Sequence, residues 1–341
     1  AGKPVVVLVD VPRLQCDACG TVRQAEIAFA APHRHCTKSF VRYVIEMRRK
    51  LTIKDLAEHL GVSEWLVRSI EKEYLHRRFS KPKLKQVRRI AIDEICLGGG
   101  RKYLTVVLDL ESGAVLFVGE GKGADALNPF WKRLKASHAK VHAVAIDMSA
   151  AYILAVTRHL PHATLVFDHF HVVKLFNEKL SDLRRDLYRE AQDKLHKDVL
   201  KGTRWLLLKN PDNLDEERDE SARLREALEL NHSLATAYYL KEDLRQLWSQ
   251  SSKRAAGKFL TAWCRRAEAS GIRMLQRFAH TLRCHRTGLL AWYDVPISTG
   301  PLEGTNKKIR TLQRNAYGYR DREYFILKLY ALHLSRYVLV G

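Results

Sequence analysis

The spacing of apolar residues changes character along this chain, and each change marks a border between different kinds of structure. From residue 37 the apolar positions recur with the period of an amphipathic helix. Between residues 89 and 168 they form short runs bounded by turn residues, which predicts strands. From residue 172 to about 286 no strand pattern occurs, and the chain is charged and helical in pattern. This order predicts an α/β protein with a long all-helical part.

The region with the strand pattern predicts a mixed sheet. Its apolar runs lie at 89–93, 103–108, 114–118, 141–147 and 163–168. Short turns separate the first three runs, which suits antiparallel strands, and helical patterns separate the later ones. We therefore expect a mixed sheet with helices on its faces.

Three helical patterns precede the strands and indicate a DNA-binding fold. The second opens at Thr52, where Asp55 completes an acidic form of the capping box, and it ends at Gly61. The third runs from Ser63 to about residue 74. Three helices with a glycine-containing turn before the last are typical of a helix-turn-helix. A helical hairpin that only packs would show the same pattern.

The charge balance indicates a polyanionic partner. Lys and Arg number 59 against 38 Asp and Glu, a net charge of +21 that suits nucleic acid or an acidic membrane. No apolar run approaches the ~18 residues of a spanning helix, so we expect DNA and no membrane. Within the helix-turn-helix, Arg68 is the best candidate for a base edge, and Ser69 or Lys72 for a phosphate. The basic stretch 76–85 is interpreted as a linker that touches the DNA backbone.

Six cysteines are too few and too scattered for a disulfide scaffold, which favours a reducing cytoplasm. Cys16 and Cys19 form a C-x-x-C pair, which is half of a tetrahedral zinc site. His33, His35 and Cys36 are the nearby candidates for the other ligands, and we expect the set Cys16, Cys19, His33 and Cys36. The alternative is two free thiols. A redox pair is disfavoured because no strand-then-helix pattern surrounds the motif.

Two aspartates are predicted to meet at one edge of the sheet. Asp93 ends the first expected strand and Asp147 ends the fourth, so neighbouring strands would present both carboxylates together. Mg²⁺ prefers such oxygen ligands, and two ions held there can activate water and stabilise the leaving oxygen of a phosphodiester. Glu303 is a candidate for the third ligand. An aspartate at a strand end is often only a turn or cap residue, and spacing alone does not select these three.

The helix that begins near Glu303 carries a second basic surface. Lys307, Lys308, Arg310 and Arg314 lie along it. Such a helix can follow the DNA backbone while its first turn reaches the metal ions.

Four segments occur in order along the chain. They are Ile90-Ala91-Ile92-Asp93-Glu94, Val144-Ala145-Ile146-Asp147-Met148-Ser149, Val166-Phe167-Asp168-His169-Phe170-His171-Val172-Val173-Lys174, and Gly300-Pro301-Leu302-Glu303-Gly304-Thr305-Asn306 with its continuation through Arg314 to Tyr319. Together they resemble the ISL3 family of bacterial insertion-sequence transposases, and the resemblance extends to the cysteines and the helix-turn-helix. No single segment is specific, but the combination is. Family members commonly carry further cysteines upstream, which this sequence lacks.

The resemblance implies that Asp93, Asp147 and Glu303 form a catalytic triad that binds Mg²⁺ or Mn²⁺. It implies that Asp168 and His171 belong to a (Cys/Asp)-x-x-His element that supports the site. The implied reaction is metal-assisted hydrolysis at the terminal inverted repeats of the element, followed by attack of the freed 3′-hydroxyls on target DNA. Because two ends are joined in one event, we expect a homodimer, located in the bacterial cytoplasm and associated with the nucleoid.

The expected fold is an RNase H-like mixed-sheet catalytic domain with an all-α insertion, preceded by a small zinc-finger-like module and a helix-turn-helix. The expected boundaries are 1–36 for the zinc-finger-like module, 37–84 for the helix-turn-helix and basic linker, 85–172 for the first catalytic part, 173–285 for the helical insertion and 286–341 for the second catalytic part carrying Glu303. The resemblance suggests the place of this insertion. We expect it to pack as a domain and to contact DNA or pair two subunits.

Two other functions fit parts of the sequence. A domesticated regulator would keep the fold and the DNA binding but would no longer cut, and the three carboxylates at matching positions argue against it. A serine or tyrosine recombinase would need a cluster of arginines around its nucleophile, and the sequence does not supply one. A DNA transposase is therefore the function we expect.

Overall fold

The computed structural model describes residues 5–31, 35–98 and 103–333, so the expected zinc ligand His33 lies outside the described residues. The chain divides into two compact units. The first joins the described residues up to Pro82 with residues 319–333, and the second runs from Lys83 to Gly318. The region expected as the second catalytic part, 286–341, is thus divided, because its last described residues pack with the helix-turn-helix.

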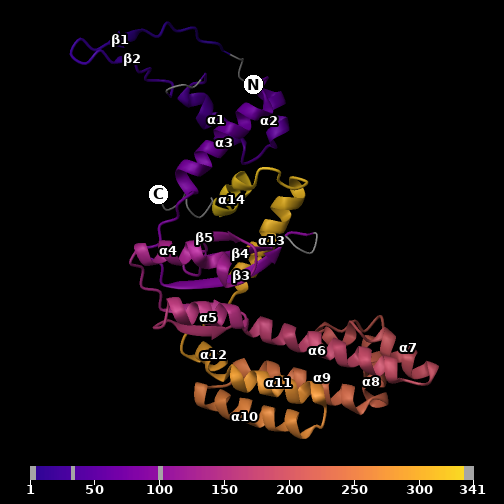
Figure 1. The fold of residues 1–341 in the computed structure, drawn as a ribbon. Helices are drawn as coiled ribbons and strands as arrows, with labels where there is room; N and C mark the ends of the chain where they lie inside the picture. The colour runs from indigo at the N-terminus through magenta and orange to yellow at the C-terminus, as the bar shows by residue number, and fades with distance from the viewer. Residues whose placement is uncertain (1–4, 32–34, 99–102, 334–341) are drawn as a thin grey trace. The chain divides into compact units, whose positions relative to one another are not determined.

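The first unit contains a β-hairpin and the helices of the helix-turn-helix (Figure 1). Its elements are β1 (Arg13–Gln15) paired antiparallel with β2 (Val22–Gln24), α1 (Lys38–Met47), α2 (Ile53–Leu60), α3 (Glu64–Phe79) and α14 (Arg322–Tyr330). Thr52 caps α2 by accepting a hydrogen bond from the amide of Asp55 at 3.1 Å. Gly61 ends α2 with a φ of 62°, a conformation that favours glycine. The predicted N-cap at Thr52 and the turn at Gly61 are confirmed, and Asp55 contacts the Thr52 hydroxyl through its carboxylate, at 2.7 Å.

The third helix is longer than the sequence predicted. The basic stretch from His76 was expected to be a linker, but α3 continues to Phe79. Leu75 and Phe79 are buried against Tyr324 and Leu327 of α14, which the chain supplies only near its end. The prediction was wrong because local periodicity does not show an apolar partner from a distant segment.

The second unit is built on a five-stranded mixed sheet. Its strands are β3 (Arg89–Cys96), β4 (Tyr103–Asp109), β5 (Val115–Glu120), β6 (Ala143–Ile146) and β7 (Thr164–Phe167), in the spatial order β5-β4-β3-β6-β7. β3, β4 and β5 pair antiparallel, whereas β6 runs parallel to both β3 and β7. Between these strands lie η1 (Ala124–Leu127), α4 (Asn128–Ala136) and α5 (Ala150–His159). The predicted mixed α/β sheet is confirmed, and its order agrees with an RNase H-like domain.

The register of the sheet places two aspartates at the same level. The last parallel pair between β3 and β6 is Ala91 with Ala145, and Asp93 and Asp147 each lie two residues further on. The prediction that Asp93 ends its strand is wrong, because β3 continues to Cys96 through its pairing with β4. Asp93 therefore lies inside β3, at the point where its parallel neighbour has ended.

Helices and the loops that join them, with no strand, make up the described residues between β7 and the helix that carries Glu303. They are α6 (His169–Glu190), α7 (Lys194–Gly202), η2 (Leu206–Leu208), η3 (Pro211–Asn213), α8 (Glu220–Leu230), α9 (His232–Arg245), η4 (Gln246–Ser249), α10 (Lys253–Ala269), α11 (Arg273–Cys284), α12 (Arg286–Leu290) and η5 (Ala291–Tyr293). We call residues 169–293 the helical segment. Phe176, Trp263 and Phe278 pack edge to face in its core and join α6, α10 and α11.

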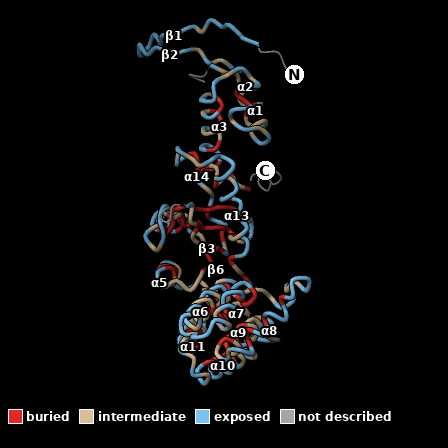
Figure 2. Tube along the Cα trace, turned by 90° about the vertical axis from the view of Figure 1, so that its right-hand side faces the viewer, coloured by how far each residue is buried: buried red, intermediate tan, exposed pale blue. Residues whose placement is uncertain are grey.

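The chain returns from the helical segment to the sheet through α13 (Gly300–Asn315), which packs along β3. Figure 2 shows buried residues along β3 and β6, whereas the β1–β2 hairpin is exposed. The buried strands hold the backbone of the site firmly, because their apolar side chains are removed from water on both faces.

Candidate active site

Two carboxylates of like charge lie near each other where β6 ends beside β3. Burial, first of all, and then the neighbouring Asp147 raise the pKa of Asp93, although the nearby His171 and Lys174 of α6 act in the opposite direction. One oxygen of Asp147 accepts a hydrogen bond from the amide of Ser149 at 2.9 Å. A pair of half-buried carboxylates is an arrangement that a bound cation would stabilise.

A third side chain reaches this pair from α13. The Asn306 amide donates a hydrogen bond through Nδ2 to Oδ2 of Asp93 at 2.9 Å. The other amide atom of Asn306, Oδ1, is buried and has no hydrogen-bond partner among the described residues. An unpaired buried oxygen is costly, so it marks a place where a donor or a cation would be favourable.

Glu303 lies one turn before Asn306, so the two residues share a face of α13. Its carboxylate pairs with Lys307 at 2.9 Å, and its side chain is 39% exposed. Within the part of the chain that the structure describes, no three His, Cys, Asp or Glu side chains are grouped closely enough to hold a metal ion. The structure thus brings Asp93 and Asp147 together and leaves the Glu303 carboxylate with Lys307. All three offer oxygen ligands, which fits Mg²⁺ or Mn²⁺.

Asp168 joins the start of the helical segment to the start of α13. Its side chain is almost fully buried, and its Oδ1 caps α6 by accepting from the amide of Phe170 at 3.0 Å. Its Oδ2 accepts from both the amide of Thr299, at 3.0 Å, and the hydroxyl of Thr299. Because Thr299 directly precedes α13, Asp168 fixes the beginning of the helix that carries Glu303.

Three residues of this site were not predicted from the sequence. Asn306 and Thr299 contact Asp93 and Asp168 respectively, and Lys174 lies near enough to act on the pKa of Asp93. A signal for Asn306 was present, because a residue three positions after Glu303 must share its helix face. Thr299 carried no such signal, since its partner comes from another part of the chain.

The cysteine pair lies in the turn of the β1–β2 hairpin. The amide of Cys16 donates to the carbonyl of Thr21 at 3.0 Å. Hydrogen bonding with Thr21, first with its hydroxyl and then with its backbone, and with the Cys16 side chain lowers the pKa of the exposed Cys19 thiol. Cys36 is half-buried at the base of α1. Among the described residues, these cysteines do not form part of a three-ligand group.

The two candidate DNA contacts of α3 differ in their surroundings. Arg68 is exposed and has no carboxylate within 4 Å among the described residues, whereas Lys72 pairs with Asp321 at 2.9 Å and Glu323 at 2.8 Å. Hydrogen bonds to these two carboxylates raise the pKa of Lys72. Lys72 is therefore engaged by the first turn of α14. Trp65, at 73% exposed, lies one turn before Arg68.

The basic residues predicted along α13 are exposed. Lys308, Arg310 and Arg314 lie on its surface, and Lys307 is the residue that pairs with Glu303. The helix therefore presents positive charge beside the candidate active site, as the sequence predicted.

Comparison with known proteins identifies the class. A family model described as a transposase, of the DDE type and the ISL3 family, matches residues 90–329. A second model, described as the helix-turn-helix domain of transposase family ISL3, matches residues 25–75. The sheet with its carboxylates and the helix-turn-helix thus belong to a DNA transposase of the DDE type.

Similarity to individual proteins gives the same result. The chain is 34% identical to the transposase for insertion sequence element IS1001 of Bordetella parapertussis over 330 residues, 96% of this chain and 81% of that protein. It is 31% identical to the transposase for insertion sequence element IS1557 of Mycobacterium tuberculosis over 263 residues, 70% of this chain and 59% of that protein. The chain belongs to the ISL3 family of transposases.

Among solved structures, the Drosophila P element transposase strand transfer complex aligns with a TM-score of 0.42 and 11% identity, over 88% of this chain and 92% of that chain. No helix among the described residues is long and apolar enough to span a membrane.

Proposed function

We propose that this transposase binds the terminal inverted repeats of an insertion sequence, cleaves DNA at the element ends and joins the freed 3′-hydroxyls to target DNA. Asp93, Asp147 and Glu303 are the proposed catalytic carboxylates. The observation that carries the proposal is the position of Asp93 and Asp147 at one level of neighbouring parallel strands, with the Glu303-bearing helix packed along β3.

The three carboxylates would hold Mg²⁺ or Mn²⁺, which, when bound, activates an attacking oxygen and stabilises the leaving oxygen of a phosphodiester. Asn306 orients Asp93 by fixing one of its oxygens. Asp168 holds the start of α13 and thereby sets the place of Glu303 relative to the aspartates. In this arrangement Glu303 would exchange its ion pair with Lys307 for the metal ion.

The helix-turn-helix supplies sequence recognition in this proposal. Arg68 contacts a base edge from α3, and the basic face of α13, with Lys307, Lys308, Arg310 and Arg314, follows the phosphate backbone. Because two element ends are joined in one event, the functional form is a homodimer acting on DNA in the bacterial nucleoid.

We also propose that the N-terminal hairpin binds one structural zinc ion. Its turn brings Cys16 and Cys19 together, and tetrahedral zinc commonly uses two cysteines from such a turn. The remaining ligands would come from His33, His35 and Cys36, which precede α1. The helical segment would be an insertion into the catalytic domain, since it lies in the chain between β7 and α13.

Incubation of the purified chain with labelled duplex DNA carrying the element ends, with and without Mg²⁺, tests the proposed function. Cleavage at the end of the inverted repeat that requires the metal supports it. Specific binding to the ends without any cleavage in Mg²⁺ or Mn²⁺ would instead support the alternative of a regulator that keeps the fold and no longer cuts.

A further inference from the structure

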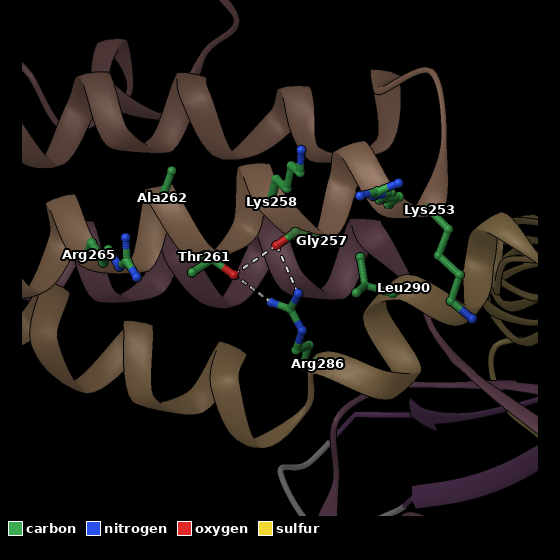
Figure 3. Close-up of a pocket in the computed structure, with 9 residues that line it drawn as sticks. Lys253, Gly257, Lys258, Thr261, Ala262, Arg265, Arg286 and Leu290 are labelled. Atoms are coloured by element: carbon green, nitrogen blue, oxygen red, sulfur yellow. Dashed lines mark hydrogen bonds between the residues drawn. The ribbon is translucent and has the colours of Figure 1, made fainter.

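A basic groove lies in the helical segment, apart from the candidate active site. Its volume is about 790 Å³, and α10 and α12 form its walls (Figure 3). Five of the nine residues that line it are cationic, namely Lys253, Arg254, Lys258, Arg265 and Arg286. None of the described residues that line it is acidic or aromatic. The groove therefore offers charge to an anion but no surface on which a base could stack.

Most of these cations have no internal partner. Arg254, Lys258 and Arg265 are exposed, and among the described residues none of them has a carboxylate within 4 Å. The nearby carboxylates pair with other cations, since Asp294 pairs with Lys253 at the end of the groove and Glu268 pairs with Arg283 outside it. Exposed cations left without partners keep their charge available for a ligand.

The spacing of the free cations follows one face of α10. Arg254, Lys258 and Arg265 are four and seven residues apart, which places them in a row on a helix. At 1.5 Å per residue this row extends about 16 Å. Because one strand of a DNA duplex carries a phosphate about every 3.4 Å along the axis, the row spans about five phosphates. A free phosphate or a single nucleotide would engage only a part of it.

The floor of the groove holds a fixed guanidinium. Arg286 donates from Nη1 to the hydroxyl of Thr261 at 3.0 Å and from Nη2 to the carbonyl of Gly257 at 2.9 Å (Figure 3). A Cβ atom at Gly257 would lie 2.9 Å from Nη2 of Arg286, so glycine is what allows this approach. A guanidinium held in place loses less freedom on binding a phosphate than a mobile one does.

We infer that this groove binds the phosphodiester backbone of duplex DNA without regard to sequence. The inference rests on the proposed function and adds a DNA-binding surface outside both the helix-turn-helix and the α13 surface. Its cations match the regularly spaced phosphates of a duplex, and its lining offers no aromatic side chain on which a base could stack and no acidic side chain that could accept from one.

The experiment compares the 341-residue chain with two triple variants of equal charge change. One is Arg254→Gln/Lys258→Gln/Arg265→Gln in the groove. The control is Lys201→Gln/Arg273→Gln/Arg277→Gln, which changes exposed residues outside the groove. Affinity for a duplex of unrelated sequence is measured by fluorescence anisotropy over a range of salt concentrations, without added Mg²⁺ or Mn²⁺ so that no cleavage occurs.

A plot of log affinity against log salt concentration has a negative slope, and each phosphate that the protein neutralises contributes about −0.9 to it. In the groove variant, which loses three cations, the magnitude of this slope should decrease by between about two and three. In the control variant the slope should change by less than about one. Gly257→Ala, which displaces Arg286 while favouring the helix, should lower affinity in the same direction by a smaller amount. A groove variant whose slope equals that of the wild type or of the control overturns the inference. Because binding is measured without added Mg²⁺ or Mn²⁺, that result is separate from a failure to cleave the element ends.

Discussion

Asn306 of α13 and Asp93 of β3 are joined by a hydrogen bond of 2.9 Å between Nδ2 and Oδ2. This contact connects the helix that carries Glu303 to the strand that carries the first proposed ligand. Asn306 lies one turn from Glu303, so a shift of α13 along β3 would move Glu303 and at the same time disturb the contact that orients Asp93. The geometry of the candidate site therefore depends on how α13 is held.

The Asp168–Thr299 contact should control catalysis through α13. Asp168→Asn removes an acceptor that faces two donors of Thr299. We expect cleavage to fall about 10- to 100-fold, as for other residues that orient metal ligands, and a weaker apparent affinity for Mg²⁺, with binding to the ends unchanged. Cleavage rates over a Mg²⁺ series measure both effects.

Ser298→Ala provides the matched control, since within the described part of the chain the Ser298 hydroxyl bonds only inside its own turn, where it accepts from the amide of Gly300 at 3.2 Å. Thr299→Val should also lower the cleavage rate and the apparent affinity for Mg²⁺. The double variant should cleave only slightly more slowly than the slower of the two single variants, because both changes break the same interaction. Effects that simply add would contradict a shared role of these two residues.

The ends should be recognised through Arg68 more than through Lys72. Arg68→Gln should cost about 1–3 kcal/mol of affinity for the end sequence and much less for unrelated DNA. Lys72→Gln should have a smaller effect on binding, because Lys72 is already paired with Asp321 and Glu323. Anisotropy with end and unrelated duplexes measures both.

Asp321→Asn separates the two roles that Lys72 can have. If Lys72 holds α14 to α3, the Asp321→Asn and Lys72→Gln proteins should show similar small decreases in stability and in binding. A Lys72→Gln protein that binds as weakly as Arg68→Gln, beside an unaffected Asp321→Asn protein, would instead show that Lys72 binds a phosphate directly.

How much the sequence predicted depends on the range of the interactions. The Thr52–Asp55 cap and the strand pattern are local, and both were predicted and observed. The extension of α3 to Phe79 depends on α14, and the continuation of β3 past Asp93 depends on pairing with β4. The candidate site shows the same division. Motif matching selected Asp93 and its partners, but no local pattern could show the hydrogen bonds that Asn306 and Thr299 make across the fold.

The buried Glu71 should stabilise the first unit. It pairs with Arg48 and Lys328 at 2.8 Å and 2.7 Å and accepts a hydrogen bond from Tyr324 at 2.6 Å. Burial acts to raise the pKa of Glu71, but Lys328 and Arg48 outweigh it, so the pKa lies below its ordinary value of 4.5. Glu71→Gln leaves two cations poorly paired and should cost about 3–5 kcal/mol at neutral pH.

The sign of this pH dependence follows from the lowered pKa. The contribution of Glu71 is fully present above about pH 4.5 and is lost as the pH falls through the lower folded pKa. The free energy of unfolding of α1, α3 and α14, measured by hydrogen exchange, should therefore be higher in the wild type than in Glu71→Gln at pH 6 to 7. This difference between the two proteins should become smaller below about pH 4. The exposed Glu46 of α1, changed to Gln, should have little effect. If the difference in stability between wild type and Glu71→Gln is the same at all pH values, the charge of Glu71 does not cause it.

Zinc should bind with one ion per chain at the N-terminal hairpin. Metal analysis of purified protein, compared with the Cys16→Ser/Cys19→Ser variant, decides this, because thiolates are the ligands that the serines cannot replace. Cys284→Ser, at an exposed cysteine far along the chain, is the control and should keep its zinc. Equal zinc in all three proteins would make Cys16 and Cys19 free thiols.

The three proposed carboxylates should act as one unit. Glu303→Gln keeps the size of the side chain but removes the charge that would hold a divalent ion. Cleavage should fall by several orders of magnitude, while affinity for the ends, which depends on the basic surfaces, stays nearly unchanged. Asp93→Asn and Asp147→Asn should reduce cleavage to a similar extent, and pairs of these changes should cost little more than one.

Glu94→Gln is the matched control, one position from Asp93 on the same strand. Side chains alternate along a strand, and Glu94 accepts hydrogen bonds from Tyr152 at 2.6 Å and from the amide of Gly123 at 3.0 Å. Glutamine retains an oxygen that can accept both, so Glu94→Gln should cut far better than Asp93→Asn. If Glu303→Gln cuts normally while binding the ends normally, Glu303 is not the third carboxylate. If Glu94→Gln fails as severely as Asp93→Asn, the defect reflects disturbance of β3, and the specific assignment of Asp93 loses its support.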